Sequence, residues 1–494
     1  MNRRGVWKKI KRSEIPKGRR CVKHKWVLKV KRNGVYRARL VACGYSQIPG
    51  VDFSENYAPV IHDVTYRLML ICEMLNGYAS KIIDFETAFL HGDLEEEIYM
   101  DCPDGMTHMD DECLVLKKTI YGLVQSARQW YKKVIECLES IGFSRSQVDP
   151  CLFIKKDENG VVYLAIYVDD CYAVGDLKAI ERVIKDIVST GYTVKVEDDL
   201  SDYLSCKIIF DKEKKKAWLG QPHLIKNLET KFGEDVKGLQ RYGTPGTPGQ
   251  GIRRIVDGPG KLCIEDHKAY RSGVGMLLYL VKHSRPDIAN AVRELSKALD
   301  GATQSAFKEM KRVIKFVLDT KTKGLKLEPI FGHQWFMEMF SDSEYGGDKD
   351  TRISVGGFIL FLLNVPILWR SKAQRSVTLS SAEAEYVAMS EAAKEIKFVY
   401  QLLISMNIKV TLPIIVRVDN VGAIFMSENA STSGRTRHVD IRYHYVREFI
   451  EEGFLKVVFV RTKENIADGF TKNINNEIYG MHSEKYLAEM PKGN

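Results

Sequence analysis

Hydrophobic and polar positions alternate in short runs along residues 1–215, which predicts a mixed α/β region. The runs SKIIDF, VVYLAIYV and CYAVG have the apolar content of buried strands. Helical spacing appears near Tyr66–Leu75 and in QSARQWYKKVIECLESIGF. A stretch that alternates apolar and basic residues about Asn33-Gly34 predicts a β-hairpin with one basic face.

A different pattern follows the segment GTPGTPGQGIRRIVDGPGK, whose glycines and prolines predict a linker or a long loop. Residues 267–325 have helical spacing that is broken at Arg285-Pro286. From Trp335 onward the predicted order is β-β-β-α-β-α-β-α, with a long helix beginning near Ser381. We therefore expect an α/β chain with two or three domains of about 100–200 residues.

Composition and charge narrow the class of protein. No apolar run reaches the roughly 18–20 residues of a membrane span, and the N-terminus lacks an apolar signal core. The ten cysteines are scattered, which fits neither a disulfide framework nor a structural zinc site. We expect a cytoplasmic or nuclear protein that is neither secreted nor bound to a membrane. Residues 1–40 hold 16 Lys/Arg against one acid, Glu14, so the hairpin is expected to contact phosphates of a nucleic acid.

Two adjacent acids, Asp169 and Asp170, stand between apolar runs in IYVDDCYAVG. A solvated turn is the ordinary explanation for such a pair, but at the end of a buried hairpin the two carboxylates would repel each other. Mg²⁺ would resolve this conflict, since it prefers carboxylate and phosphate oxygens. Asp84, at the end of SKIIDF, is a candidate third carboxylate, although alone it reads as a helix N-cap.

At this point the chain resembles the reverse transcriptase and RNase H portion of a copia-type retrotransposon Pol polyprotein, over nearly its whole length. The matching blocks are RARLVACGYSQIPGVDFSENYAPV, IIDFETAFLHGDLEEEIYM, KKTIYGLVQSARQWY, YVDD, YRSGVGMLLYL with RPDIANAV, WRSKAQRSVTLSSAEAEYVAMSEAAKE, and RHVDIRYHYVREFIEEG with NIADGFTK. Upstream protease and integrase motifs are not found. We also expect the chain to be truncated at its N-terminus, because Trp7 matches a tryptophan that the family normally precedes with a helix.

The resemblance implies an α/β (α+β) fold, a right-hand polymerase of palm, fingers and thumb followed by an RNase H-like domain with a mixed sheet. The expected segments are fingers and palm over 1–242, a Gly/Pro-rich linker or loop over 243–262, a helical thumb or connection over 263–334, an RNase H-like domain over 335–475 and a tail over 476–494.

The same resemblance implies the polymerase residues. The metal-binding palm carboxylates would be Asp84, Asp169 and Asp170. Phe89 would be the aromatic gate that excludes a ribose 2′-OH, a role that is compatible with a place in the core. The other expected nucleotide contacts are Gly122 and Gln125, near the templating pair, and Arg37 and Arg39, near the triphosphate; a helix start and a solvated basic face are the ordinary alternatives.

Four acids of the C-terminal third would form a second metal site with the RNase H fold: Asp342, Glu385, Asp419 and Asp468. Singly, each has an ordinary explanation such as a helix cap or a solvated acid. Glu383 competes with Glu385, and Glu385-Tyr386-Val387-Ala388 resembles the catalytic helix of related RNases H. His438 is either structural or catalytic.

Two departures from the family stand out: Glu344-Tyr345 replaces Asp-Trp, and Leu204-Ser205-Cys206-Lys207 replaces a Leu-Gly-Ile-Glu-like run in a primer-contacting hairpin. The expected function is RNA-directed DNA synthesis from dNTPs with cleavage of RNA in the RNA/DNA hybrid. The expected partners are an RNA template and a DNA primer, and the expected cofactor is Mg²⁺, two ions per site, with Mn²⁺ as an alternative. The competing hypothesis is an inactive or host-adopted remnant that binds nucleic acid.

Overall fold

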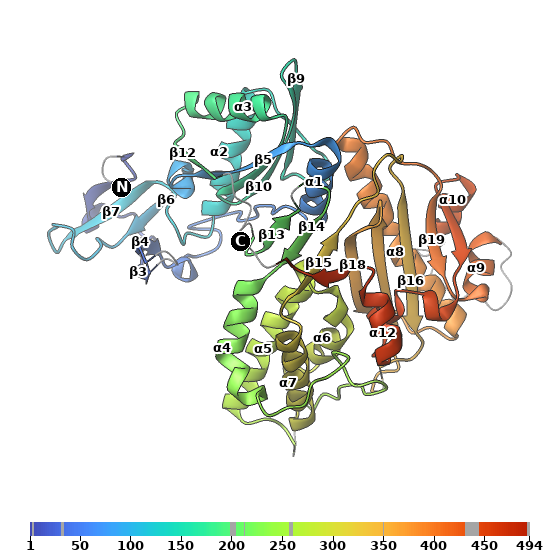
Figure 1. Ribbon diagram of the computed structural model, residues 1–494. Coiled ribbons are helices and arrows are strands. Elements are labelled where there is room, and N and C mark those ends of the chain that lie inside the picture. Colours follow the sequence, from blue (N-terminus) through green and yellow to red (C-terminus); the bar gives the residue numbers. More distant parts are fainter. Residues whose placement is uncertain are drawn as a thin grey trace. The chain divides into compact units, whose positions relative to one another are not determined.

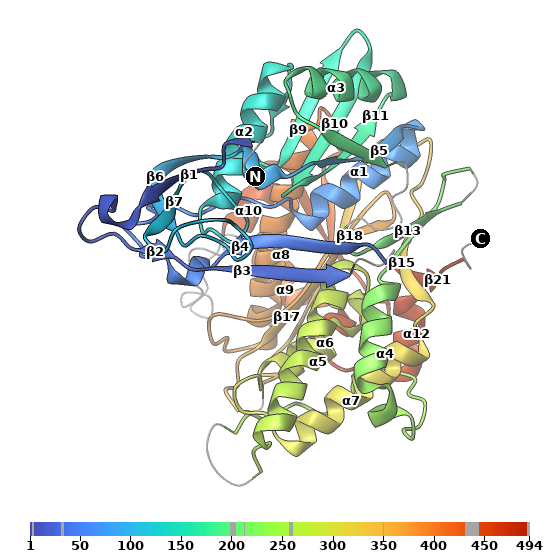
Figure 2. The same ribbon diagram turned by 90° about the vertical axis from the view of Figure 1, so that its left-hand side faces the viewer.

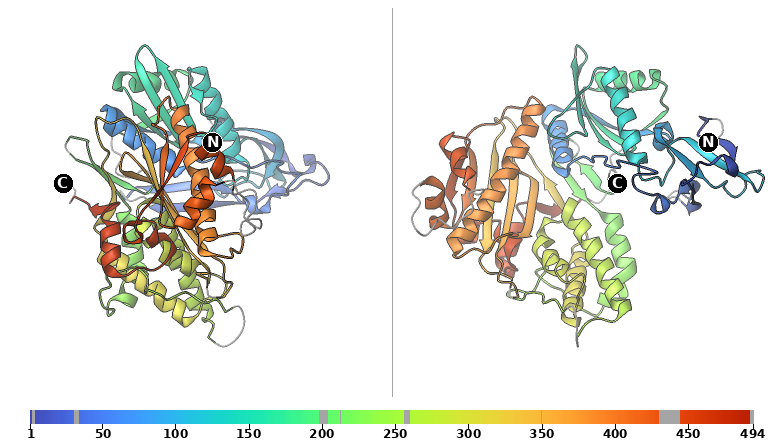
Figure 3. Two further views of the ribbon diagram at one scale, coloured as in Figure 1. Left: turned by 90° about the vertical axis from the view of Figure 1, so that its right-hand side faces the viewer. Right: turned by 180° about the vertical axis from the view of Figure 1, so that it is seen from behind.

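The computed structural model describes residues 1, 4–30, 34–197, 204–211, 213–255, 260–348, 350–429 and 444–491. The chain divides into two compact units, Met1–His62 with Ala79–Asp198, and Asp63–Tyr78 with Asp199–Asn494. Each unit combines helices with sheets (Figures 1 and 3). Within the described part, no helix is long and apolar enough to cross a membrane.

A six-stranded sheet with the order β12-β5-β11-β10-β9-β8 is the centre of the first unit. Its strands are β5 (Ala79–Phe85), β8 (Ser144–Arg145), β9 (Leu152–Asp157), β10 (Gly160–Tyr167), β11 (Asp170–Gly175) and β12 (Val194–Glu197). Helices α2 (Ser126–Ser140) and α3 (Leu177–Ser189) share one hydrophobic core with the sheet. This core takes Ile83 and Phe85 of β5, so the residue between them, Asp84, points to the opposite face.

Two smaller sheets complete the first unit. One has the order β1-β7-β6-β2 and consists of β1 (Trp7–Lys11), β2 (Cys21–Val22), β6 (Asp93–Met100) and β7 (Glu112–Lys118). The other is the hairpin of β3 (His24–Val30) and β4 (Tyr36–Ala42), whose two strands lie side by side in Figure 2. The strand register puts the basic residues of the hairpin on one face, as predicted: Lys25, Lys29, Arg37 and Arg39.

The second unit contains α1 (Asp63–Asn76), a helical bundle and two sheets. The bundle helices are α4 (Pro222–Val236), α5 (Ile264–His283), α6 (Ala289–Ser296) and α7 (Gln304–Asp319), and their apolar faces meet in one core. A four-stranded sheet has the order β13-β14-β15-β21, with β13 (Lys207–Phe210), β14 (Ala217–Gly220), β15 (Lys323–Leu327) and β21 (Leu487–Glu489).

The other sheet of this unit has the order β18-β17-β16-β19-β20. Its strands are β16 (Met337–Glu344), β17 (Val355–Leu362), β18 (Val365–Ala373), β19 (Ile414–Val418) and β20 (Leu455–Phe459). β16, β17 and β18 are antiparallel, while β19 pairs in parallel with β16 and β20. This is a mixed sheet of the RNase H-like kind that was expected, so the predicted fold class is confirmed.

Helices cover both faces of the mixed sheet. They are α8 (Ser381–Ser405), α9 (Val421–Glu428), α10 (Tyr445–Glu451), α11 (Asp468–Thr471) and α12 (Asn476–Ser483). A Cβ on Gly356 would meet Ala388 of α8 at 3.4 Å, whereas one on Gly357 would meet Phe470 of α11 at 2.7 Å. Neighbouring residues of a strand point to opposite faces, so α8 and α11 lie on opposite sides of β17, and Gly357 permits the close approach of α11.

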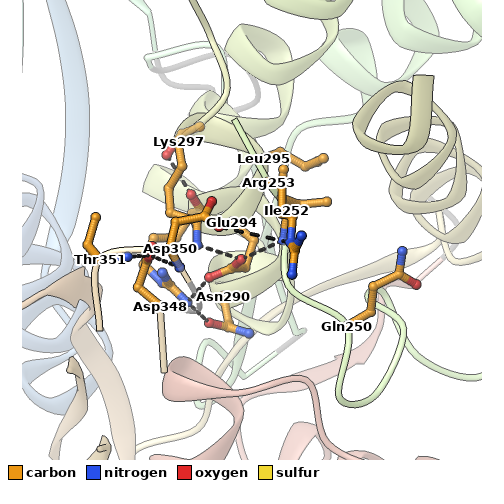
Figure 4. Close-up of polar contacts among 12 residues, drawn as sticks. Gln250, Ile252, Arg253, Asn290, Glu294, Leu295, Lys297, Asp348, Asp350 and Thr351 are labelled. Carbon is orange, nitrogen blue, oxygen red and sulfur yellow. Dashed lines mark hydrogen bonds and ion pairs between the residues drawn. The ribbon is translucent and has the colours of Figure 1, made fainter. Parts of the chain in front are cut away.

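The described part of the Gly/Pro-rich segment before residue 256 is a loop that is attached to the bundle. The Ile252 N–H donates to Glu294 Oε2 (3.0 Å), and Thr247 Oγ1 donates to Glu309 Oε1 of α7 (3.0 Å). Figure 4 shows Ile252, Glu294 and Lys297 in one group with Asp348 of the loop between β16 and β17. The contacts place residues 199–242 in the second unit, and the expected division into five segments stays a prediction.

Candidate active sites

The Asp169-Asp170 pair lies at a tight turn between β10 and β11. Tyr167 and Asp170 are register partners, so Val168 and Asp169 alone make the turn. Val168 has a φ of 60°, a left-handed conformation that is strained for a β-branched residue. The Trp130 indole N–H donates to the Val168 carbonyl (2.6 Å) and so holds the turn in position.

Asp84 lies directly opposite Asp170 in the neighbouring strand. The two residues are register partners of β5 and β11, so their side chains share the face of the sheet that α2 and α3 leave free. The Phe85 N–H donates to the Asp169 carbonyl (3.1 Å), which joins the turn to the end of β5. The structure thus brings the three predicted carboxylates to one place, named here the turn site.

The turn site is electrostatically prepared for a cation. Burial and the negative charge of Asp169 raise the pKa of Asp84, against the smaller opposing effects of Lys195 and Arg37. A carboxylate that is costly to ionise beside another carboxylate gains from a bound positive charge. Carboxylate oxygens are also the ligands that Mg²⁺ prefers, so the donor set fits a divalent cation.

Aromatic and basic side chains surround the turn site. Arg39 lies over the ring of Tyr121 (4.9 Å to the centroid), and Tyr121 packs edge to face against Phe89 (4.8 Å between centroids). Burial raises the pKa of Tyr121, and so does the charge of Asp169. Phe89 therefore packs in an aromatic cluster next to the acids, as a rigid gate would require, and its role in excluding a 2′-OH stays a prediction.

Gln125 and Gly122 make close contacts within the protein. Gln125 is 1% exposed, and its Nε2 donates to the Asp52 carbonyl (2.9 Å) while its Oε1 accepts from Gln47 Nε2 (3.0 Å). Gly122 has a φ of 90°, and a Cβ there would lie 2.2 Å from the Ala42 carbonyl oxygen. Both residues make structural contacts, and their contact with nucleotide stays a prediction.

The second group of carboxylates lies at the ends of β16 and β19 and at the start of α8. Asp342, Glu385 and Asp419 each offer an oxygen within 4.8 Å of the others. Among the residues that the structure describes, this is the one trio of potential ligands at that spacing, so Asp84, Asp169 and Asp170 do not all approach so closely. With Asp468, these residues are named here the acid cluster.

Burial dominates the chemistry of the acid cluster. Asp342 is 2% exposed and Glu385 5% exposed. Burial raises the pKa of Asp342 to about 7, and burial together with the charges of Asp342 and Asp419 raises the pKa of Glu385 to about 9. Glu385 Oε1 accepts from the Ser343 N–H (2.9 Å), whereas the buried Oε2 finds no hydrogen-bond partner among the described residues. An unpartnered buried carboxylate oxygen beside two other acids is what a divalent cation would satisfy.

Glu383 and Glu385 lie in different surroundings, and the choice of Glu385 as the metal ligand stays a prediction. The Glu383 N–H donates to the side chain of Ser380 (3.2 Å), and Glu383 Oε2 accepts from the Leu379 N–H (2.7 Å). Ser380 therefore caps the N-terminus of α8, and the Glu383 carboxylate binds the backbone N–H just before this cap. Glu385 is the residue that lies with the other acids.

Asp468 begins α11, and it does not belong to the trio whose ligand atoms lie within 4.8 Å of one another. Its carboxylate Oδ1 accepts from Lys472 Nζ (2.9 Å), which also lies 3.9 Å from Asp342 Oδ2. Thr471 Oγ1 donates to the same Oδ2 of Asp342. Burial alone would lower the pKa of Lys472. The neighbouring acids outweigh burial and raise this pKa above its usual value, so the side chain is a cation.

Sequence reasoning missed Thr471 and Lys472. Both stand in NIADGFTK, but a lysine four residues after an acid becomes informative only when a helix is known to begin at Asp468. Tyr121 was missed for a similar reason, since its contacts come from β4 and from the segment that contains Phe89. His438 lies outside the described residues.

The loop after β16 is held by an ion pair of Asp348, four residues beyond Glu344. Lys297 Nζ lies 2.8 Å from Asp348 Oδ2 and 2.9 Å from Glu294 Oε2, and these side chains converge in Figure 4. The Lys297 charge contributes to lowering the pKa of Asp348 against the effect of burial. This network connects the strand that carries Asp342 with helix α6.

Comparisons with known proteins show what the chain is similar to. The family model described as reverse transcriptase (RNA-dependent DNA polymerase) matches residues 5–233. The retrovirus-related Pol polyprotein from transposon TNT 1-94 of Nicotiana tabacum is 32% identical over 98% of this chain and 37% of that polyprotein. The corresponding polyprotein from transposon RE1 of Arabidopsis thaliana is 32% identical over 91% of this chain and 30% of its own length.

This chain therefore spans well under half the length of these two relatives. Among solved structures, a foamy viral protease-reverse transcriptase in complex with double-stranded DNA covers 93% of this chain and 68% of its own, with a TM-score of 0.45 and 13% identity. A likeness that distant carries no argument, so the fold class depends on the strand order described above.

Proposed function

Because the chain is a relative of copia-type retrovirus-related Pol polyproteins and matches the reverse transcriptase family over residues 5–233, we propose that it is an RNA-directed DNA polymerase with an attached RNase H. The observation that carries the proposal is the Val168-Asp169 turn, which sets Asp170 opposite Asp84 inside the matched region. The acid cluster, at the strand ends of the mixed sheet, supports the second activity.

At the turn site we propose that Asp84, Asp169 and Asp170 hold Mg²⁺, or Mn²⁺ in its place. Arg37 and Arg39 would bind the triphosphate of a dNTP, since guanidinium groups pair well with phosphate oxygens. Phe89 would stand against the sugar. Because Asp84 and Asp170 are fixed by strand pairing and the turn by Trp130, these ligands need little rearrangement when substrate arrives.

At the acid cluster we propose that Asp342, Glu385, Asp419 and Asp468 form a site for divalent metal and that RNA of the hybrid is cut there. At both sites the metal would supply Lewis acidity and neutralise charge on the transferred phosphoryl group. The chain's own contribution is orientation: Ser343 fixes one oxygen of Glu385, and Thr471 fixes one oxygen of Asp342.

The proposed partners are an RNA template, a DNA primer and the hybrid that they form. The basic face of the β3–β4 hairpin would bind phosphates without reading sequence. The A-like shape of the hybrid offers recognition that is also independent of sequence. We place the protein in the cytoplasm or the nucleus, where such templates occur.

Primer extension tests the polymerase. The full chain, with poly(rA) annealed to oligo(dT), dTTP and Mg²⁺, is expected to lengthen the primer, and Asp169→Asn is expected to abolish extension. Asp157→Asn, at the end of β9 in the same sheet, is the matched control and should extend normally. Absence of extension by folded protein, or equal extension by Asp169→Asn, contradicts the proposal.

Cleavage of a labelled RNA/DNA hybrid tests the RNase H separately. Asp419→Asn is expected to lose cleavage and to keep primer extension. Asp300→Asn, which removes an exposed acid paired with Arg254, is the control that should keep both activities. Cleavage that persists in Asp419→Asn means that the acid cluster is not the site.

A further inference from the structure

A lysine reaches into the acid cluster. Lys472 Nζ lies 2.9 Å from Asp468 Oδ1 and 3.9 Å from Asp342 Oδ2. The lysine side chain is 36% exposed, whereas those of Asp342 and Asp468 are 3% and 4% exposed. An ammonium group therefore already neutralises the part of the cluster that contains Asp468.

Local structure explains this position. Helix α11 comprises Asp468 to Thr471, and Lys472 is its C-cap with an extended backbone. Residues four apart on a helix face the same side, so Lys472 returns over the Asp468 carboxylate. Gly357 permits α11 to approach the sheet closely, and this brings the pair against Asp342 of the neighbouring strand.

The two carboxylate oxygens of Asp342 consequently have different surroundings. Oδ2 accepts from Thr471 and faces Lys472. Glu385 Oε2 is buried and finds no partner in the described part of the chain, and Asp419 is partly exposed. The described residues therefore supply a cation to Asp468 and to Asp342 Oδ2 but none to Glu385 Oε2.

We propose that the acid cluster binds one divalent cation, between Asp342, Glu385 and Asp419, and that the Lys472 ammonium is its built-in second positive charge beside Asp468. This inference rests on the proposed RNase H function, and it replaces the two ions that the family resemblance implies at this site with one ion and one lysine. A second divalent ion near Asp468 would be repelled by the ammonium at a few ångströms, and it would have to displace Lys472 to bind.

The test counts bound ions and needs no activity. Mn²⁺ is titrated into the full chain without nucleic acid, in an Asp84→Asn/Asp169→Asn background that disables the turn site, and free Mn²⁺ is followed by electron paramagnetic resonance. The expected count is one ion in this parent. Lys472→Met, which keeps the length of the side chain and removes its charge, is expected to bind a second ion at least tenfold more tightly than the parent does.

Two neighbouring Mn²⁺ ions also broaden each other's spectrum, so a spin-coupled signal should appear in Lys472→Met and be absent from the parent and from Lys472→Arg. Two ions in the parent overturn the inference. A count of one ion in Lys472→Met also overturns it, once a thermal transition has shown that this variant is folded. If Lys472→Met does not fold, Lys472→Gln takes its place, and the parent count still decides. No ion in the parent contradicts the proposed metal site itself, which separates failure of the function from failure of this inference.

Discussion

The turn site and the acid cluster both consist of carboxylates, but the two sites differ in how exposed and how closely spaced these carboxylates are. Asp84, Asp169 and Asp170 are each partly exposed and do not all lie within 4.8 Å of one another. Their surroundings include a two-stranded hairpin with a basic face and the aromatic pair of Tyr121 and Phe89. Much of the turn site is therefore open to whatever binds there.

The acid cluster contains carboxylates that are far less exposed than those of the turn site. Asp342 and Glu385 are almost fully buried, one oxygen of Glu385 has no partner among the described residues, and Lys472 supplies a positive charge. From this difference we propose that the acid cluster is preformed for a cation, whereas the turn site would be completed when the phosphates of the proposed substrates arrive. Mg²⁺ commonly binds through one or two carboxylates together with substrate phosphates, as this account requires of the turn site.

The largest expected effect separates two glutamates of one helix turn. Glu385→Gln should reduce hybrid cleavage by about 10³-fold, since loss of a metal ligand costs several kcal/mol of transition-state stabilisation. Glu383→Gln should retain cleavage within about threefold and lower the free energy of unfolding by about 1 kcal/mol, because it weakens the hydrogen bond from the Leu379 N–H just before α8. Cleavage rates and urea denaturation of both variants check this, and equal loss of cleavage would remove Glu385 from its assigned place.

A smaller effect is expected from the basic hairpin. Arg37→Ala should raise the KM for dNTP by about 10-fold to 100-fold in primer extension and leave hybrid cleavage unchanged, because Arg37 lies near enough to Asp84 to affect its pKa. Lys25→Ala is the matched control on the same face of the hairpin, near its base. If Arg37→Ala and Lys25→Ala change the KM for dNTP equally, Arg37 has no specific role at the turn site.

A smaller expected difference between the two sites is the effect of Mg²⁺ and pH on the Tm. Burial and the neighbouring acids raise the pKa of Glu385 from 4.5 to about 9, so across this window folded, metal-free protein keeps a proton that the unfolded chain has released. The resulting contribution to the free energy of unfolding is present below pH 4.5 and is lost as the pH rises toward 9. Mg²⁺ favours the ionised carboxylate, so it should raise the Tm by about 3–5 °C more at pH 8.5 than at pH 6.

Differential scanning calorimetry in EDTA or Mg²⁺ measures this difference. Glu385→Gln should abolish most of it, whereas Asp169→Asn should leave it unchanged. An equal rise in Tm at the two pH values in the unsubstituted protein would show that the acid cluster is not the group that couples metal to protons.

The smallest effect concerns neither site. Ser205 has a φ of 59°, in the left-handed region, at a position where the family resemblance gives a glycine. Ser205→Gly should therefore raise the free energy of unfolding by about 1 kcal/mol, with primer extension and cleavage unchanged. Ser189→Gly, within α3, is the control that should destabilise by about 0.5 kcal/mol in the same urea denaturation. A loss of stability in Ser205→Gly would show that this turn is not strained.

Motif spacing predicted the acids well because strand pairing decides where they lie. Asp84 ends one apolar run and Asp170 begins another, so antiparallel pairing of the two runs alone brings them together. The order β-β-β-α-β likewise determined most of the mixed sheet. In these cases short local patterns are enough for the prediction, because strand pairing brings residues that are distant in the sequence next to one another.

The remaining features depend on tertiary contacts that no local pattern carries. Gln125 stays a predicted nucleotide contact, and the hydrogen bonds of its amide to Asp52 and Gln47 inside the protein could not be expected from its place in the sequence. The glycines and prolines of the segment before Lys261 predicted a loop but not its attachment to Glu294. Lys472 was unremarkable among many lysines until the start of α11 placed it over Asp468.

The most direct measurement counts Mn²⁺ ions on the unsubstituted chain, first without nucleic acid and then with template-primer and a non-hydrolysable dNTP. The account predicts ion binding without nucleic acid that Asp419→Asn abolishes and Asp169→Asn leaves intact. It further predicts additional ions on adding the substrates, which Asp169→Asn abolishes and Asp419→Asn leaves intact. Ion binding that is lost in Asp169→Asn without nucleic acid, or retained in Asp419→Asn, would contradict a preformed acid cluster beside a turn site completed by its substrates.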